Sequence, residues 1–196
     1  SEAMHPATAE LLRVYRDPMA AAGLALAAWT QVLGAARRGR CAGHLRTRLQ
    51  MAEVLPSLPA QVRGQFESVD VLVRERRHLV RWELGELAQV FRQAGLQVVA
   101  LKGAAYELQG RALAAGRMVG DIDLMVPAEQ LAHAEAMLKA QGWRADAMDA
   151  YDEHYYRRWS HEIPPLRHPS RELEVDLHHA VTPAMTDRGI DTARLI

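Results

Sequence analysis

The sequence predicts an α+β protein in which a helical N-terminal layer precedes a small α/β core with a mixed sheet. Three observations support this class. Apolar residues recur at helical spacing over roughly the first 90 residues. The first β-type run begins after Gly95, and helix-like and strand-like segments alternate from there onward. With 196 residues and 49% hydrophobic content the chain can bury a core. The predicted domains are a helical region over residues 1–94 and a core over residues 95–196.

The N-terminal elements follow from helical periodicity and from the turn residues between them. Leu11 and Val14 share helical spacing, and Asp17 with Pro18 stops or restarts that helix. Gly39 closes the next helix. Ser57, in the turn "PSLP", is predicted to cap the helix that follows it. The predicted helices after Pro18 cover residues 19–38, 43–55 and 59–94.

The C-terminal half alternates between strand-like and helix-like segments. "LQVVALKG" is β-type, "AAYELQGRAL" is helix-like, and "MVGDIDLMVP" is a second strand that Pro127 ends. "AEQLAHAEAMLKAQGW" is an amphipathic helix with Gly142 just after its end. The last two segments, residues 153–168 and 171–181, alternate as antiparallel strands do around the turn "HPSRE". The predicted order is helices followed by β-α-β-α-β-β.

Composition narrows the possible partners and the compartment. The 24 basic and 24 acidic side chains cancel, so a nucleic-acid or membrane surface is not indicated. The single cysteine, Cys41, excludes an internal disulfide framework and fits a reducing compartment. The longest apolar run, "MAAAGLALAAW", is too short to span a membrane. We therefore expect a cytoplasmic protein of bacterial type; the oligomeric state cannot be predicted from these features.

Two carboxylates stand one residue apart in an apolar strand. Asp121 and Asp123 share one face because strand side chains alternate, and two like charges there need a cation between them. Mg²⁺ prefers carboxylate oxygens and leaves positions open for phosphates. Asp176 repeats the pattern in "EVDLHH" and is the candidate third ligand. The alternative is that the pair ends a strand or begins a loop; the match with Asp176 and the cost of unpaired buried carboxylates favour a metal site.

A second candidate element is the turn at Lys102 and Gly103. It lies between a strand and a helix, where backbone N–H groups at a helix start can bind phosphate. Lys102 could neutralise a phosphate charge there, and Arg117, four residues before Asp121, could reach a triphosphate. The alternatives are an ordinary tight turn, a solvent-facing lysine and a surface-loop arginine.

Three stretches in order, "ALKGAAYEL", "RMVGDIDLMV" and "EVDLHHAV", carry a family resemblance. They resemble the polymerase-β-type nucleotidyltransferase superfamily and, more closely, an uncharacterised bacterial nucleotidyltransferase family with an "LKG" turn, an "R…DIDLLV" strand and a late "VDLHW" strand. The helical lead-in, with Trp29 and the turn "PSLP", is also similar. The resemblance therefore covers nearly the whole chain and implies a nucleotidyltransferase-like core.

The resemblance also implies roles for residues of this chain. Asp121 and Asp123 would ligate catalytic Mg²⁺ or Mn²⁺, and Asp176 would complete the ligand set and help to activate the attacking hydroxyl. In the same comparison, Lys102 and Gly103 would line the nucleotide phosphate pocket with support from Arg117. His178 corresponds to the histidine of "DLHW", as a possible accessory residue whose role the comparison does not define.

The chain departs from the family pattern at three places. Ala104 follows Gly103 where the wider superfamily usually has a serine that touches a phosphate, and His179 replaces the usual tryptophan after His178. Relatives often continue beyond the position of Ile196, so the resemblance allows a core truncated at its C-terminal end. These departures bear on phosphate contact, packing and the acceptor site.

Two classes of function, an enzyme and a regulatory module, are compatible with these features, and so is a zinc site. The leading hypothesis is an enzyme that transfers a nucleoside monophosphate from an NTP to the hydroxyl of an unknown acceptor, with Mg²⁺ or Mn²⁺. The alternative is a catalytically weak nucleotidyltransferase-fold module that binds or regulates a partner protein. A zinc site is a further possibility, because neutral imidazoles are common zinc ligands. Its candidate ligands would be His161, His168, His178 and His179.

Overall fold

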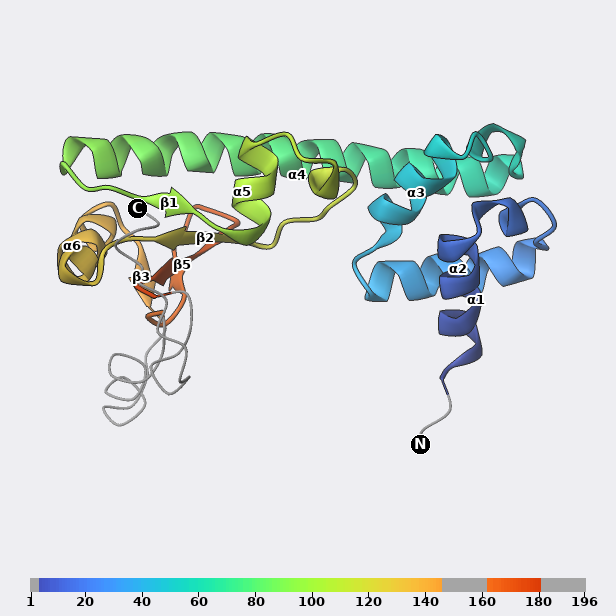
Figure 1. Ribbon diagram of the computed structural model, residues 1–196, viewed down its shortest axis with the longest axis horizontal. Helices are drawn as coiled ribbons and strands as arrows, with labels where there is room; N and C mark the ends of the chain where they lie inside the picture. The colour runs from blue at the N-terminus through green and yellow to red at the C-terminus, as the bar shows by residue number, and fades with distance from the viewer. Residues whose placement is uncertain (1–3, 146–161, 181–196) are drawn as a thin grey trace. The chain divides into compact units, whose positions relative to one another are not determined.

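The computed structural model describes residues 4–145 and 162–180. It divides the chain into two compact units, which are described separately below. The first comprises Ser1–His78 with Arg111–Met118, and the second comprises Leu79–Gly110 with Val119–Ile196. The predicted α+β class is confirmed, with helices leading into a mixed sheet (Figure 1). Within the described ranges, no helix has the length and apolarity that a membrane crossing requires.

The first unit is helical, as predicted. Its first helix begins after His5, whose Nδ1 accepts a hydrogen bond from the Ala7 N–H at 3.2 Å, and ends at Arg16, just before Asp17. Asp17 then accepts from the Met19 N–H at 3.1 Å and starts a new turn, which confirms the predicted stop and restart. The elements of this unit are α1 (Pro6–Arg16), η1 (Pro18–Ala21), α2 (Leu26–Arg38), α3 (Ala42–Met51), η2 (Leu55–Ser57), the first part of α4 (Ala60–Gln93) and η3 (Ala112–Ala114).

Two local predictions in this unit are wrong. The continuous helix predicted over residues 19–38 is interrupted between η1 and α2, where Leu24 N–H bonds to Ala21 O as in a tight turn. Leu24 is partly buried and packs against the hydrophobic core there, which is consistent with packing outweighing its helical preference. Ser57 does not cap the following helix: its hydroxyl donates to Val54 O at 2.7 Å within its own short turn.

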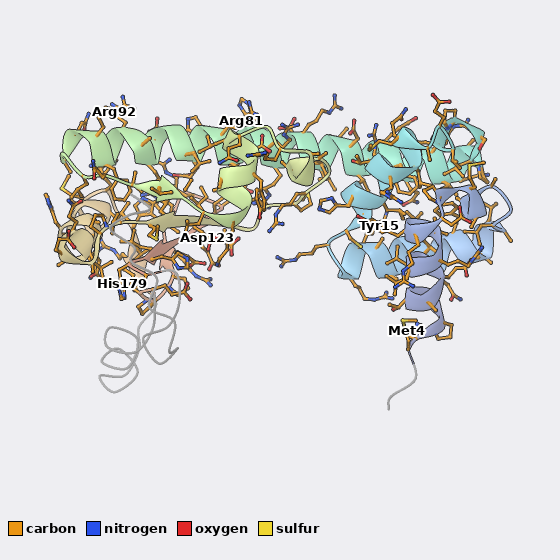
Figure 2. All side chains as sticks on the ribbon, viewed as in Figure 1. Met4, Tyr15, Arg81, Arg92, Asp123 and His179 are labelled. Carbon is orange, nitrogen blue, oxygen red and sulfur yellow. The ribbon has the colours of Figure 1, made fainter. Side chains whose placement is uncertain are left out.

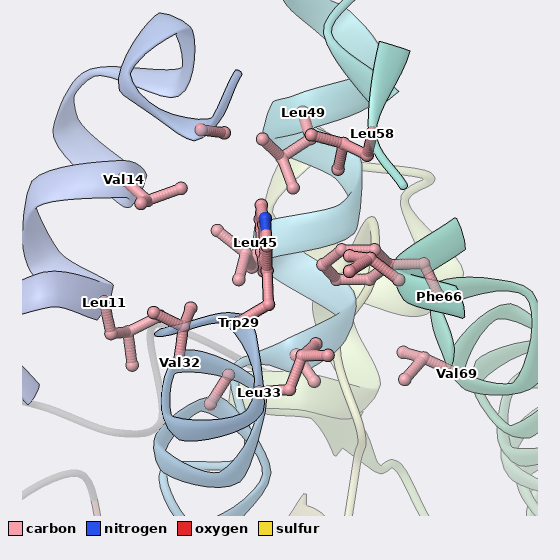
Figure 3. Close-up of a cluster of buried hydrophobic side chains, with 14 of the residues drawn as sticks. Leu11, Val14, Trp29, Val32, Leu33, Leu45, Leu49, Leu58, Phe66 and Val69 are labelled. Carbon is pink, nitrogen blue, oxygen red and sulfur yellow. The ribbon is translucent and has the colours of Figure 1, made fainter. Parts of the chain in front are cut away.

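The core of the first unit gathers around two aromatic rings (Figure 3). Trp29 of α2 and Phe66 of α4 meet edge to face, with 5.9 Å between ring centroids and planes at 89°. Both side chains are about 1% exposed. Around them pack aliphatic side chains from α1, α2, α3, α4 and the turn before α4, including Leu11, Val14, Val32, Leu33, Leu45, Leu49, Leu58 and Val69.

The second unit contains the sheet. Its elements are the last part of α4, β1 (Val99–Ala100), α5 (Lys102–Leu108), β2 (Asp121–Met125), η4 (Ala128–Gln130), α6 (Leu131–Ala140), β3 (Arg144–Ala145), β4 (Leu166–Arg167) and β5 (Glu174–His178). The strand order is β1-β2-β5-β4-β3. Only the β2–β5 pairing is parallel among these strands, so the sheet is mixed, as predicted. The predicted antiparallel pair around residues 168–172 is present as β4 and β5. Residues 153–161 of the predicted first strand lie outside the described residues.

Alternation along β2 and β5 separates an apolar face from an acidic one. Ile122, Leu124, Val175 and Leu177 are at most 3% exposed and belong to a core that α4 also contributes to. Arg81 of α4 donates to Glu107 of α5 at 2.7 Å, which ties α4 to α5 within this unit. Because neighbouring side chains point to opposite faces, the aspartates between these apolar residues face away from that core.

Candidate functional site

Strand pairing brings the three predicted carboxylates together. β2 and β5 run parallel, and their register places Asp123 opposite Asp176. Asp121 lies two residues earlier on β2 and therefore on the same face as Asp123. Each of the three offers a carboxylate oxygen, and these atoms lie within 4.8 Å of one another. Oxygen ligands at such separations can surround one hard divalent cation. We call Asp121, Asp123 and Asp176 the acidic cluster.

Asp123 is labelled on the sheet of the second unit in Figure 2. It is the buried member of the acidic cluster, with an exposure of 2%. Its Oδ1 accepts from Lys102 Nζ at 2.6 Å and contacts His178 Nε2 at 3.0 Å. Burial by itself raises the pKa of this carboxyl, but hydrogen bonds from His178 and Lys102 outweigh burial, so that the pKa is lowered. Asp123 is therefore held as a carboxylate. Because a carboxylate oxygen can only accept, Nε2 of His178 donates in this contact.

Asp176 is partly buried and lacks such donors. Its Oδ1 is inaccessible to solvent and makes no hydrogen bond with any described residue. Burial, followed by repulsion from Asp123, Asp121 and Glu162, raises its pKa to about 6, and nearby His178 opposes this only in part. A buried carboxylate oxygen without a donor is costly unless a cation compensates it. The donor set of the acidic cluster thus fits a divalent metal ion.

Lys102 and Gly103 stand where β1 passes into α5. Lys102 has a φ of 44°, in the left-handed region, and begins the helix, while Gly103 and Ala104 are buried behind it. The ammonium group bonds to Asp123, which raises the pKa of Lys102, and the Lys102 side chain is 57% exposed. Lys102 therefore places a positive charge beside the acidic cluster while its side chain remains open to solvent. Ala104 is fully buried in the core, so a packing position stands where the superfamily usually shows serine.

Arg117 belongs to the first unit rather than to the second. There its charge acts on His44, whose pKa is lowered by burial first and by Arg117 second. Its support of a nucleotide stays a prediction. The structure thus brings Lys102 together with the acidic cluster and leaves the predicted role of Arg117 open.

The structure does not bring the histidines of the predicted zinc site together within residues 4–145 and 162–180. Within those ranges the acidic cluster is the group of three or more His, Cys, Asp or Glu side chains that could hold a metal. His168 instead contacts Gln141 O at 3.1 Å and accepts from the Ser170 N–H at 3.2 Å. His161 lies outside the described residues.

Sequence reasoning missed Glu162. This residue forms an isolated antiparallel bridge with His178, and its Oε2 lies 3.2 Å from His178 Nδ1. It also raises the pKa of Asp176. Glu162 does not stand in an apolar strand-like run as the three aspartates do, and "IPPL" follows it. The local sequence therefore gives no reason to place Glu162 at a site. Only the pairing of its backbone with β5 brings it to the site.

Comparison with known proteins identifies the family. The family described as "uncharacterised nucleotidyltransferase" matches residues 26–196, well over half of the chain. The chain belongs to this nucleotidyltransferase family. The match spans all three stretches that carried the resemblance. Membership in a nucleotidyltransferase family confirms the expectation that the protein is an enzyme. A search of curated proteins and a search of solved structures found no significant match. Bacterial origin and a cytoplasmic location stay predictions.

Proposed function

We propose that this nucleotidyltransferase transfers a nucleoside monophosphate from an NTP to an acceptor hydroxyl, with Mg²⁺ or Mn²⁺ held by Asp121, Asp123 and Asp176. One observation carries the proposal: three carboxylates converge within 4.8 Å, and the Asp176 oxygen is buried without a hydrogen-bond donor among the described residues. Such a cluster is unfavourable by itself and becomes favourable when a divalent cation binds. Family membership supplies the NTP as the class of substrate.

In the proposed reaction, the acceptor oxygen bonds to the α-phosphorus of the NTP. The bond from the α-phosphorus to the bridging oxygen breaks, pyrophosphate leaves, and the proton of the acceptor hydroxyl passes to Asp176. A divalent ion would supply charge that stabilises the phosphoryl oxygens and the leaving group. Asp176 suits this role because its carboxylate lies beside the other two proposed metal ligands, where it can accept a hydrogen bond from the attacking hydroxyl.

The remaining site residues are proposed to bind the nucleotide. Lys102 is exposed enough to exchange its contact with Asp123 for a phosphate oxygen. Gly103 would let the backbone at the start of α5 approach the same phosphates, and Arg117 would add a second positive charge. With Ala104 buried, phosphate binding depends on Lys102 and on backbone N–H groups rather than on a hydroxyl.

Metal-dependent nucleotide binding tests the proposed function directly. Isothermal titration of ATP and GTP into the wild type, with and without Mg²⁺, should give binding that requires the metal. Asp121→Ala/Asp123→Ala should lose it, because two of three ligands are gone. Glu129→Gln, an exposed acid of η4 in the same unit, is the matched control and should bind as the wild type does. Absence of metal-dependent binding by the folded wild type would count against the proposal, and binding without any transfer would favour the regulatory module.

Replacing Lys102 should affect metal and nucleotide in opposite directions. Lys102→Met removes a positive charge 2.6 Å from an oxygen of Asp123, so the affinity for Mn²⁺ alone should rise several-fold, on the order of 1 kcal/mol. Affinity for the metal–nucleotide pair should fall about tenfold or more, because a phosphate contact is lost. Electron paramagnetic resonance of free Mn²⁺ measures the first change, and calorimetry measures the second.

A lysine outside the acidic cluster provides the control for that prediction. Lys139 of α6 pairs with Glu135 at 2.7 Å and is 46% exposed. Lys139→Met should leave both affinities unchanged. Equal weakening of Mn²⁺ binding and nucleotide binding in Lys102→Met would show that Lys102 supports the fold of the site rather than balancing its charge.

A further inference from the structure

His178 lies between two acidic side chains at the edge of the acidic cluster. Its side chain is 2% exposed, with Nε2 3.0 Å from Asp123 Oδ1 and Nδ1 3.2 Å from Glu162 Oε2. Backbone pairing holds both neighbours in place: β2 runs beside β5, and Glu162 bridges to His178 while Ile163 N–H bonds to Leu177 O at 3.0 Å. The contact of Nε2 with Asp123 thus holds the imidazole ring on one side, and Glu162 lies beside its other nitrogen.

The contact with Asp123 limits how that carboxylate can turn. The terminal torsion of an aspartate is broad, so an aspartate without directional hydrogen bonds samples many orientations. Here His178 and Lys102 both contact Oδ1, and no described residue donates to Oδ2. Lys102 sits on an exposed, flexible side chain, whereas the His178 ring is buried. His178 is therefore the rigid member of the pair that orients Asp123.

We propose that His178 is a positioning residue that orients the Asp123 carboxylate for a divalent cation, and that Glu162, whose Oε2 lies 3.2 Å from Nδ1, helps to keep the His178 ring in place. This inference rests on the proposed function, since it assigns a role within the same metal site. Partners that orient a ligand from behind typically change metal affinity about 10- to 100-fold when they are removed. Neither residue needs to touch the metal or the nucleotide for this effect.

The test compares Mn²⁺ affinity, measured by electron paramagnetic resonance without nucleotide, among matched variants. His178→Leu removes the donor, and its affinity should fall about 10- to 100-fold. His178→Gln places an amide N–H at a reach similar to that of Nε2 and should stay within about threefold of the wild type. Circular dichroism on each variant verifies that the sheet is retained. Rescue by glutamine separates orientation of Asp123 from simple filling of a buried space.

Glu162 gives a second route that does not disturb a buried ring, because its side chain is 29% exposed. Glu162→Gln removes the charge and keeps a hydrogen-bonding group beside Nδ1, whereas Glu162→Ala removes both. Mn²⁺ affinity should be lower in the alanine variant than in the glutamine variant by about three- to tenfold, a part of the loss that removing an orienting partner causes. This comparison decides the matter even if His178→Leu does not fold.

The outcomes separate this inference from the function on which it rests. If the wild type binds no Mn²⁺, the metal site fails and the inference fails with it. If the wild type binds Mn²⁺ but His178→Leu stays within twofold, only the positioning role of His178 is overturned. Equal losses in His178→Leu and His178→Gln, or equal affinities in the two Glu162 variants, would likewise overturn it.

Discussion

Asp176→Asn should make the metal-free protein more stable while removing its response to divalent cations. At pH 7.5 the carboxylate of Asp176 is ionised beside Asp121 and Asp123, with Oδ1 buried and without a donor among the described residues. Its pKa is raised from 3.8 to about 6, which corresponds to roughly 3 kcal/mol of unfavourable free energy in the folded state. Asparagine removes the charge and adds a donor, so we expect about 2–3 kcal/mol of added stability.

The pH dependence of this difference has a definite sign. Because the pKa of Asp176 is higher in the folded state than in the unfolded state, the folded protein binds the additional proton between about pH 4 and pH 6. The contribution of Asp176 to stability therefore improves as pH falls from 7 towards 4. The advantage of Asp176→Asn should shrink below pH 6 and vanish near pH 4.

Urea unfolding with a chelator, followed from pH 4 to pH 8, measures that advantage. Mn²⁺ at about 100 times its dissociation constant should then add about 2.7 kcal/mol to the wild type and almost nothing to Asp176→Asn. Glu129→Gln, with an exposed side chain, should match the wild type within about 0.5 kcal/mol throughout. Lower stability of metal-free Asp176→Asn at pH 7.5 would contradict the electrostatic account of the acidic cluster.

Gly116→Ala should strongly destabilise the first unit. Gly116 has a φ of +76°, which an alanine adopts at a cost of about 1 kcal/mol. Its backbone also packs directly against α3: an added Cβ would come within 2.7 Å of His44 N and closer still to the carbonyl group of Gly43. Since backbone atoms cannot turn aside as side chains do, we expect a total loss of about 3 kcal/mol or more.

Thermal unfolding measures the effect of Gly116→Ala as a shift of roughly 6–12 °C downwards. Gly64→Ala is the matched control, because Gly64 lies inside α4 with no atom within 4 Å of an added Cβ. That variant should gain up to about 1 kcal/mol from higher helix propensity. A melting temperature of Gly116→Ala within 1 °C of the wild type would show that stability does not depend on the close approach of Gly116 to the α3 backbone.

Local pattern was enough to predict the helical first half, the strand around Asp121 and the amphipathic helix before Gly142. It was not enough at residues 19–38, because the partly buried Leu24, beside the interruption, packs against a core whose other members lie elsewhere in the chain. The same limit explains Ser57, whose hydroxyl bonds to the carbonyl of its own turn instead of capping the next helix. Where a local preference, such as helix propensity or capping, competes with contacts made in the folded chain, the sequence alone does not show which of the two is stronger.

By itself, the sequence determined that Asp121 and Asp123 share a face and that Asp176 repeats their setting, because alternation along a strand is a local property of the backbone. The tertiary structure decided the rest. Parallel pairing of β2 with β5 placed Asp123 opposite Asp176, and the turn after β1 placed Lys102 in contact with Asp123. A bridge to β5 placed Glu162 beside His178. These contacts join residues far apart in the chain, and the pKa values of Asp123 and Asp176 depend on burial and donors that exist only once the sheet has formed.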